Sequence, residues 1–349
     1  MQHFNDERQW AMAIKPTRNV TMTDVATRSG VSRTTVSFVL SNRENANIPD
    51  STRQRVLEAV DALGYRPNAG AQALAAQKSD WYGLITEIVT APFAVDIIKG
   101  VQDTAWDERK FVLIASSEGD RAMETAAIEK LLEQRVAGLI YATSWHRAVT
   151  LPPAALEVPT VLINCFDLEN RFPCVVPDEE LGGYRATKRL LDAGHTRIAF
   201  INLDPAMPAA IGRRTGYDRA HAEAGITVDP ELIVYGHALA DGGYDAATAL
   251  LDGPEPPTAF FCGNDRMAMG AYDAIKERRL RIPQDIAVVG FDNQEIISQF
   301  LRPRLTTVAL PFEQMGAVGV TMLAALIAGE PLSTNRMLID CPLLERASV

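Results

Sequence analysis

The chain has 349 residues, of which 47% are hydrophobic and 22% charged, and its formal net charge is −10. This length is too great for one small domain and suffices for a small headpiece followed by a larger two-lobed body. The charge is uneven, because residues 1–78 hold ten Lys/Arg against seven Asp/Glu, a net of +3, and the remainder therefore carries −13. The acidity argues against indiscriminate nucleic-acid binding and leaves only the N-terminal region attracted to phosphate.

The composition and the motifs argue against several classes of protein. The sequence has no apolar run of membrane-spanning length and no basic-then-apolar leader, so we expect a cytoplasmic protein without a membrane partner. Its four cysteines form no Cys-x-x-Cys pair and accompany no histidine cluster, which favours buried thiols over a disulfide or a metal site. There is no phosphate-binding glycine loop and no Gly-x-Ser-x-Gly elbow, so we expect neither a cofactor nor an enzyme. Glycoside hydrolysis by paired carboxylates stays open, because acidic residues are plentiful.

Residues 21–40 predict two short helices joined by a tight turn. Thr21 and Asp24 have the spacing of a capping box, and Ser32 is placed to cap the second helix. Gly30 permits the backbone conformation of the turn, and Ala26 is small enough for the helices to cross beside it. The shared apolar face comprises Val25, Ala26, Val31, Val36, Val39 and Leu40. This combination predicts a helix-turn-helix whose second helix enters a DNA major groove, with an ordinary helical hairpin as the weaker alternative.

A third helix and a distinctive segment follow. Asp50 or Ser51 is expected to cap this helix, and Gly64 is expected to end it. The segment Tyr-Arg-Pro-Asn at residues 65–68 comes next, and then an alanine-rich stretch, residues 69–76, in which Leu74 is the one large apolar residue.

With these motifs the chain resembles the lactose-repressor (LacI/GalR) family of bacterial transcription regulators, from Val20 to its end. The resemblance implies that residues 20–66 form the DNA-binding domain and that residues 67–80 form a hinge helix and linker. It also implies that Leu74 inserts into the minor groove as an apolar wedge. The candidate DNA-binding residues are Thr21, Ser32, Arg33, Thr34, Ser37, Phe38, Asn42, Tyr65, Asn68, Gln72 and Leu74.

The second helix departs from the family at one position. Phe38 stands where many relatives have an arginine that reads guanine, and a phenyl ring cannot donate a hydrogen bond to a base edge. Base readout is therefore expected to depend more on Arg33 and Thr34. Residues 1–19 are expected to be a loosely ordered extension.

From residue 81 onward, short apolar runs alternate with amphipathic helical stretches, which predicts parallel sheets covered by helices on both faces. The expected strands are 82–88, 111–115, 138–142, 160–164, 197–201, 232–235, 259–262 and 286–291, and the expected helices are 96–108, 123–134, 181–193, 213–224, 243–251 and 265–278. The fold class is thus an all-α headpiece plus an α/β body of two doubly wound lobes. By resemblance this body is periplasmic-binding-protein-like, with crossings near 176–178, 292–294 and 306–308. Its N-lobe is expected to span about 81–176 and 308–330, and its C-lobe about 178–307 and 331–349.

Polar residues follow several of the expected strands. Asn164, Asn264 and Asp292 come directly after apolar runs, and Arg213 is placed at the start of a helix. Because ligands of open α/β sheets bind beyond the carboxyl ends of the strands, these side chains are expected to meet in one cleft. Their donors and acceptors suit a polyhydroxylated ligand, and the same four positions match sugar-contacting motifs of the family.

Two aromatic residues complete the expected effector site. Phe93 is a candidate stacking face for a sugar ring, and Trp145, with His146 beside it, follows the third strand. Alternative roles stay open, because Asn264 could be a helix N-cap and Asp292 could cap the following turn.

The expected function is a dimeric repressor whose operator affinity depends on a small polar effector, with a mono- or oligosaccharide as the favoured class. A homodimer follows from the resemblance, since one headpiece reads only half of a palindromic operator. An exported solute-binding protein and a sugar-processing enzyme are the alternatives. The first has no use for a helix-turn-helix.

Overall fold

The computed structural model describes residues 20–41, 47–66 and 79–349. The chain divides into two compact units, Met1–Lys78 and Ser79–Val349, which we call the headpiece and the body. The expectations for residues 1–19, Asn42, Asn68, Gln72, Leu74 and the hinge helix lie outside the described residues. Within the described part, no helix is both long enough and apolar enough to cross a membrane.

The headpiece has three helices, α1 (Met22–Ser29), α2 (Arg33–Leu40) and α3 (Asp50–Leu63). The capping box at Thr21 and Asp24 is confirmed, since each side chain accepts a hydrogen bond from the other's backbone N–H. The turn residue Gly30 has φ 66°, and the Ser32 hydroxyl accepts a hydrogen bond from the N–H of Thr35. The expected cap of α3 is wrong, because Pro49 occupies the N-cap position and no side chain caps the helix.

The three helices share a small apolar core. Val25, Val36 and Val56 are fully buried there, and Ala26 is 6% exposed. Burial of one such valine contributes about 1.5–3 kcal/mol, so this core accounts for much of the stability of so small a unit. The ring of Tyr65 joins this core and is 9% exposed.

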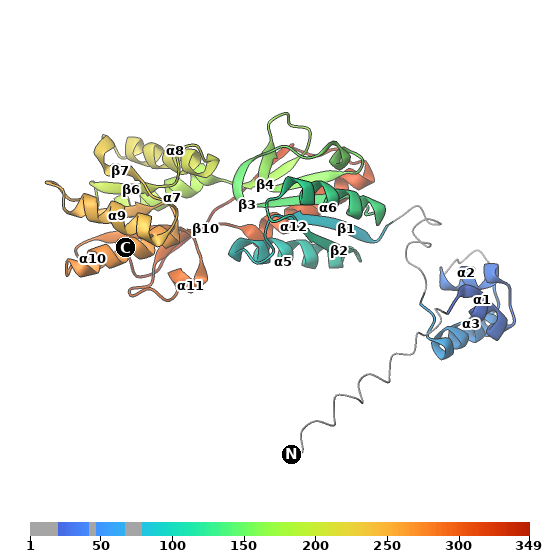
Figure 1. The fold of residues 1–349 in the computed structure, drawn as a ribbon. Coiled ribbons are helices and arrows are strands. Elements are labelled where there is room, and N and C mark those ends of the chain that lie inside the picture. The colour runs from blue at the N-terminus through green and yellow to red at the C-terminus, as the bar shows by residue number, and fades with distance from the viewer. Residues whose placement is uncertain (1–19, 42–46, 67–78) are drawn as a thin grey trace, which may run out of the picture. The chain divides into compact units, whose positions relative to one another are not determined.

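The body consists of two six-stranded sheets, one in each lobe (Figure 1). The N-lobe sheet has the order β11-β5-β4-β3-β1-β2, and the C-lobe sheet has the order β12-β10-β9-β8-β6-β7. Every neighbouring pair is parallel except β10 with β12. The strands of the N-lobe are β1 (Trp81–Thr86), β2 (Phe111–Ser116), β3 (Leu139–Val149), β4 (Thr160–Asp167), β5 (Cys174–Pro177) and β11 (Arg336–Ile339). Those of the C-lobe are β6 (Ile198–Asn202), β7 (Ile233–Tyr235), β8 (Ala259–Cys262), β9 (Ala287–Asp292), β10 (Thr306–Ala309) and β12 (Leu343–Leu344).

Helices cover both faces of each sheet, as the alternating pattern predicted. They are α5 (Pro92–Asp107), α6 (Arg121–Glu133), α7 (Glu179–Asp192), α8 (Pro208–Glu223), α9 (Ala240–Leu251), α10 (Asp265–Glu277), α11 (Glu295–Ser298) and α12 (Phe312–Ala328), with short 3-10 turns at Pro153–Leu156 and Pro230–Leu232. α12 was not expected from the sequence, because its apolar residues surround much of the helix instead of forming one stripe. α12 packs beside α5 in the N-lobe, whereas α7 packs on α8 and α9 on α10 in the C-lobe.

The chain crosses between the lobes at places that differ partly from those expected. The first crossing follows β5, as predicted. The crossing expected at 292–294 is wrong, because β9 and β10 are neighbours in the C-lobe sheet. The chain enters the N-lobe after β10 and returns between β11 and β12. Since β11 pairs with β5, residues 336–339 belong to the N-lobe and not to the C-lobe. This edge strand has only four residues, and three of them are not buried, so its apolar residues are too few to mark a buried strand.

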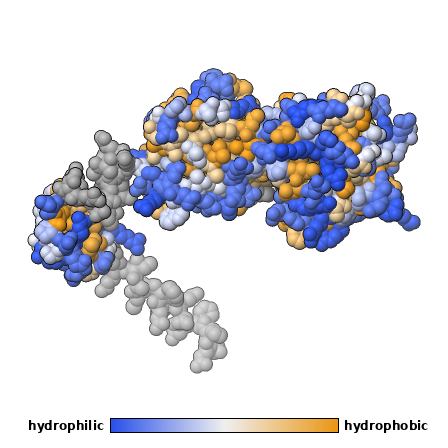
Figure 2. Space-filling model, turned by 180° about the vertical axis from the view of Figure 1, so that it is seen from behind, coloured by the Kyte–Doolittle hydropathy of each residue, from blue (hydrophilic) through white to orange (hydrophobic). Residues whose placement is uncertain are grey.

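Both lobes have apolar cores on the two faces of their sheets. In the C-lobe the rings of Phe200 and Phe261 stack with centroids 4.3 Å apart. All four cysteines are buried and free, as predicted. On the face seen in Figure 2, hydrophobic residues are intermixed with hydrophilic ones over both lobes, with hydrophobic patches close to the lobe junction.

Candidate functional site

A cleft of about 310 Å³ lies between the two lobes, at the carboxyl ends of their parallel strands. This is the position at which open α/β sheets bind ligands. All six residues expected at the effector site line this cleft, namely Phe93, Trp145, Asn164, Arg213, Asn264 and Asp292.

Glycines bring α7 and α8 close enough to build the polar floor of the cleft. A Cβ atom on Gly216 would lie 2.1 Å from the carbonyl oxygen of Glu180, and one on Gly183 would lie 2.4 Å from that of Arg213. Only glycine fits at such approaches, because a larger residue would force the two helices apart. The close packing sets Glu179, the first residue of α7, against Arg213 of α8.

Arg213 is the centre of the polar floor and is 2% exposed. Its Nε donates to Oε2 of Glu179 at 2.8 Å, and its Nη1 donates to the carbonyl oxygen of Gly263. Its Nη2 lies 3.6 Å from Oδ1 of Asp292, and the guanidinium carbon lies 3.6 Å from the ring centroid of Phe291. The side chain comes from the interior of α8 and not from the helix start that the sequence suggested. Because other protein groups already engage Nε and Nη1 of Arg213, its Nη2 is the donor best placed to reach a ligand.

The two carboxylates beside Arg213 differ in their pKa values. Burial raises the pKa of Asp292 to about 7, because the attraction of Arg213 offsets only part of the effect of burial and the nearby Glu179 raises the pKa further. Burial also opposes ionisation of Glu179, but Arg213 and His146 outweigh it and hold the pKa of Glu179 below its ordinary value. Glu179 is therefore the charged partner of Arg213, whereas Asp292 titrates near neutrality.

A further buried acidic side chain, that of Asp265, stabilises the end of β9. Asp265 accepts hydrogen bonds from the Thr307 hydroxyl at 2.6 Å and from the backbone N–H of Gln294 at 2.7 Å. Asp265, and not Asp292, therefore caps the turn that follows β9. The backbone of Asp292 has φ 98°. Burial raises the pKa of Asp265 well above its ordinary value, and Asp292 adds to this shift.

Asn264 has the structural role that the sequence left open. Its Oδ1 accepts a hydrogen bond from the N–H of Met267 at 2.8 Å, which caps α10. Its Nδ2 donates to the carbonyl oxygen of Ala238 at 2.9 Å, and the residue lines the cleft at the same time. Its part in effector binding stays a prediction.

An irregular bulge in β3 forms the N-lobe wall of the cleft. β3 pairs Ala142 with Ile163 and then Arg147 with Cys165, so residues 143–146 leave the ladder opposite a single residue, Asn164. The Thr143 hydroxyl donates to the carbonyl oxygens of Trp145 and Asn164, and Asn164 Nδ2 donates back to that of Thr143 at 3.0 Å. Bulges of this kind re-aim side chains toward binding sites. Here the bulge places Trp145 at the exposed mouth of the cleft and buries His146.

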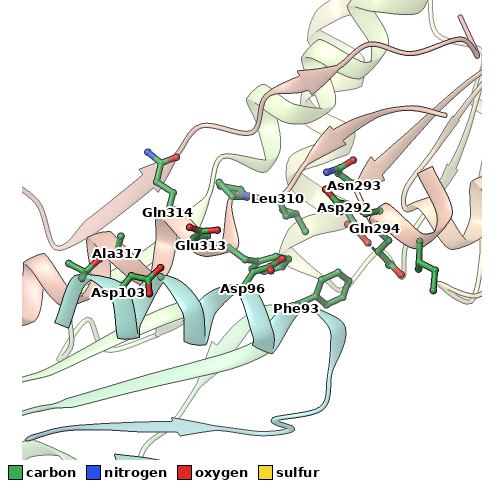
Figure 3. Close-up of a pocket in the computed structure, with 16 residues that line it drawn as sticks. Phe93, Asp96, Asp103, Asp292, Asn293, Gln294, Leu310, Glu313, Gln314 and Ala317 are labelled. Atoms are coloured by element: carbon green, nitrogen blue, oxygen red, sulfur yellow. Dashed lines mark hydrogen bonds between the residues drawn. The ribbon is translucent and has the colours of Figure 1, made fainter. Parts of the chain in front are cut away.

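Phe93 lies where the cleft meets a second, wider hollow of about 820 Å³ (Figure 3). Its ring packs against Phe312, with centroids 5.0 Å apart. Acidic side chains of α5 and α12, including Asp96 and Glu313, line the wider hollow.

Several residues of the cleft were not expected from the sequence. Glu179 is the most important, and Ser144, Arg266 and Met207 also line it. The glycine pair at 182–183 and the glycines at 212 and 216 were the available signal for Glu179, because they indicate a close helix contact.

In the headpiece, α2 presents the side chains expected to read bases. Arg33 and Thr34 are exposed in its first turn, whereas Ser37 and Phe38 are half-buried. The Ser32 hydroxyl caps the helix from an exposed position, and Thr21 does the same for α1.

Comparisons with known proteins agree with both units. Residues 21–68 match the bacterial regulatory proteins of the lacI family, and residues 187–349 match the periplasmic binding protein-like domain. The chain is 34% identical to catabolite control protein A of Priestia megaterium, over 91% of this chain and 95% of that protein. It is 33% identical to the ribose operon repressor of Escherichia coli strain K12, over 94% of this chain and 99% of that protein.

Two solved structures of transcriptional regulators are also similar. The Lac repressor dimer bound to operator and the anti-inducer ONPF has a TM-score of 0.80 at 28% identity, covering 95% of this chain and 99% of that one. The complex of the transcriptional regulator CelR with cellobiose has a TM-score of 0.66 at 30% identity, covering 95% of this chain and 100% of that one. The chain therefore belongs to the lacI family of bacterial regulatory proteins, and it is a DNA-binding transcriptional regulator.

Proposed function

We propose that this regulator is a repressor that binds a palindromic operator as a homodimer, and that a small polar effector, most simply a mono- or oligosaccharide, controls its affinity for the operator from the cleft. The observation that carries this proposal is the Arg213 cluster. It joins α7, the loop after β8 and the end of β9 at one point of the cleft. The mixed donors and acceptors there suit hydroxyl groups.

The cleft supports control of DNA binding because its walls come from both lobes. A ligand that contacts the N-lobe through Phe93 and the C-lobe through Arg213 stabilises one arrangement of the lobes over another. Through the segment between body and headpiece, this preference would alter how two headpieces meet the two half-sites. The required coupling is the difference in effector affinity between the two arrangements.

Exposed apolar side chains on the body support the homodimer. Trp106 of α5 is 64% exposed, Phe111 of β2 is 49% exposed, and Phe300, beside α11, is 69% exposed. Because β2 is an edge strand and large apolar side chains in water favour association, a second copy of the chain is the partner that these surfaces suit.

The test is fluorescence anisotropy of labelled palindromic DNA taken from beside the regulator's own gene, measured with and without a panel of mono- and disaccharides. We expect tight, salt-dependent binding with two protomers per site, which one sugar changes. Binding that responds to no sugar would contradict the assignment of the cleft. Chromogenic glycosides are included in the panel, because the cleft is proposed to bind without turnover and steady release of chromophore would contradict that.

A further inference from the structure

Two side chains of the β3 bulge have buried polar atoms that lack partners. The Ser144 Oγ and both ring nitrogens of His146 form no hydrogen bond, and His146 is only 7% exposed. Of the seven such side-chain atoms found in the described part of the chain, these three line the cleft and the other four do not. A buried polar atom without a partner destabilises the folded state, so a cluster of them in one cavity indicates a ligand that supplies the partners.

Contacts on both sides hold these two residues in the wall of the cleft. The edge of the His146 ring packs on Phe166, with centroids 5.8 Å apart and an interplanar angle of 81°. The backbone N–H of Ser144 donates to the Glu87 carboxylate at 3.2 Å, which fixes the bulge at this point. The unsatisfied atoms are therefore a property of the folded wall.

A carboxylate of the other lobe faces the same place. Glu179 Oε1 lies 3.5 Å from His146 Nδ1 without forming a hydrogen bond, and its Oε2 accepts from Arg213. Ser144 and His146 belong to the N-lobe and Glu179 to the C-lobe, so the three side chains meet across the lobe junction.

We propose that Ser144, His146 and Glu179 form a subsite for two neighbouring hydroxyl groups of a neutral, polyhydroxylated effector. One hydroxyl donates to Glu179 and accepts from the imidazole N–H, and the other exchanges hydrogen bonds with the Ser144 hydroxyl. Because the subsite spans both lobes, its occupation joins them. The inference rests on the proposed function, since it specifies the effector of the same cleft.

The local charge selects a neutral ligand over an anionic one. Beside the subsite, Arg213 is paired with Glu179 and lies close to Asp292, whereas Arg266, the other arginine of the cleft, acts on Asp292 and directs its Nε to Gln294 at 3.2 Å. A phosphate or carboxylate group at the subsite would face the Glu179 carboxylate, and like charges in a buried site repel strongly. Neutral sugars are thus favoured over their phosphate esters and their acids.

Titration calorimetry and thermal melting of the full-length protein test this proposal. The probes are ribose, glucose, galactose and cellobiose, together with the phosphate esters of ribose and glucose and with glucuronate. The variants are Ser144→Ala and His146→Leu, with Ser117→Ala as the matched control, because Ser117 is a buried hydroxyl of the same lobe that also lacks a partner but does not line the cleft. Asp292→Asn tests the cleft independently of the subsite.

We expect one neutral sugar to bind, and each of the two subsite variants to raise its Kd about tenfold or more, while Ser117→Ala leaves the Kd unchanged. Without sugar, Ser144→Ala should not lower the melting temperature, because its hydroxyl has no partner in the free protein. A purely structural role of His146 would instead give a lower melting temperature and an unchanged Kd.

Other results would overturn the inference in distinguishable ways. If Asp292→Asn abolishes sugar binding and the subsite variants do not weaken it, the subsite is wrong and the effector cleft stands. Binding of a phosphate ester or of glucuronate at least as tight as that of the neutral sugar overturns the charge argument. If no probe binds the unaltered protein, sugar control itself, and the inference with it, is wrong.

Discussion

Replacement of Asp292 by asparagine should stabilise the body, because the folded protein holds this carboxyl where ionisation is unfavourable. Its pKa is raised from 3.8 to about 7, a net shift that already includes the attraction of Arg213. Each pKa unit corresponds to about 1.4 kcal/mol, so ionised Asp292 lowers the free energy of unfolding by up to about 4 kcal/mol. Asparagine keeps the size of the side chain and removes the charge.

The sign of the pH dependence follows from the direction of the shift. Between about pH 4 and about pH 7 the folded protein keeps a proton on Asp292 that the unfolded chain releases, so stability falls as the pH rises through this window. The gain from Asp292→Asn is therefore complete above about pH 7, and should be about 2–3 kcal/mol smaller near pH 5.

Urea unfolding followed by tryptophan fluorescence measures this gain, since Trp81, Trp106 and Trp145 lie in the body. Asp285→Asn is the control. Arg281 donates two side-chain hydrogen bonds to Asp285 and lowers its pKa to about 2, so this substitution should not stabilise the protein at any pH above that value. If Asp292→Asn is no more stable than the unaltered protein near pH 8, or if its gain does not shrink toward pH 5, the burial argument is refuted.

Three further predictions concern the DNA-reading helix, the hinge and the helix contact below the cleft. Arg33→Ala should cost about 1–3 kcal/mol at one operator position and relax discrimination there, as measured by anisotropy on a set of operator variants; equal losses on every sequence would contradict base reading. Leu74→Ala should reduce operator bending in a circular-permutation gel assay, and unchanged bending would exclude the apolar wedge expected from the sequence. Gly216→Ala should lower the free energy of unfolding by about 1–3 kcal/mol and weaken effector binding, because a Cβ there would lie 2.1 Å from the Glu180 carbonyl oxygen. Gly253→Ala, whose Cβ would meet its nearest neighbour at 3.4 Å, is the matched control, and equal effects of the two substitutions would refute the packing argument.

Local patterns in the sequence were sufficient to predict the headpiece and the type of body. The capping box at Thr21 and Asp24, the turn at Gly30 and the cap at Ser32 depend on residues three or four positions apart, so their physics is readable along the chain. Polar residues after apolar runs also predicted one cleft correctly, because the parallel strands of each lobe bring their carboxyl ends to one edge of their sheet and the two edges face the same cleft.

Other features depend on contacts between distant segments, and only the tertiary structure decided them. The lobe of residues 336–339 depends on which strand they pair with, and a four-residue edge strand has no local signal that specifies its partner. Glu179 reaches Arg213 through a helix crossing, and the pKa of Asp292 depends on the burial and the charges that this crossing creates. Ser144 and His146 face the cleft because the register of β3 on β4 shifts at residues 143–146. The sequence thus determined the headpiece helices and most of the strands and helices of the body, whereas the pairing and close packing of the elements decided which side chains complete the site.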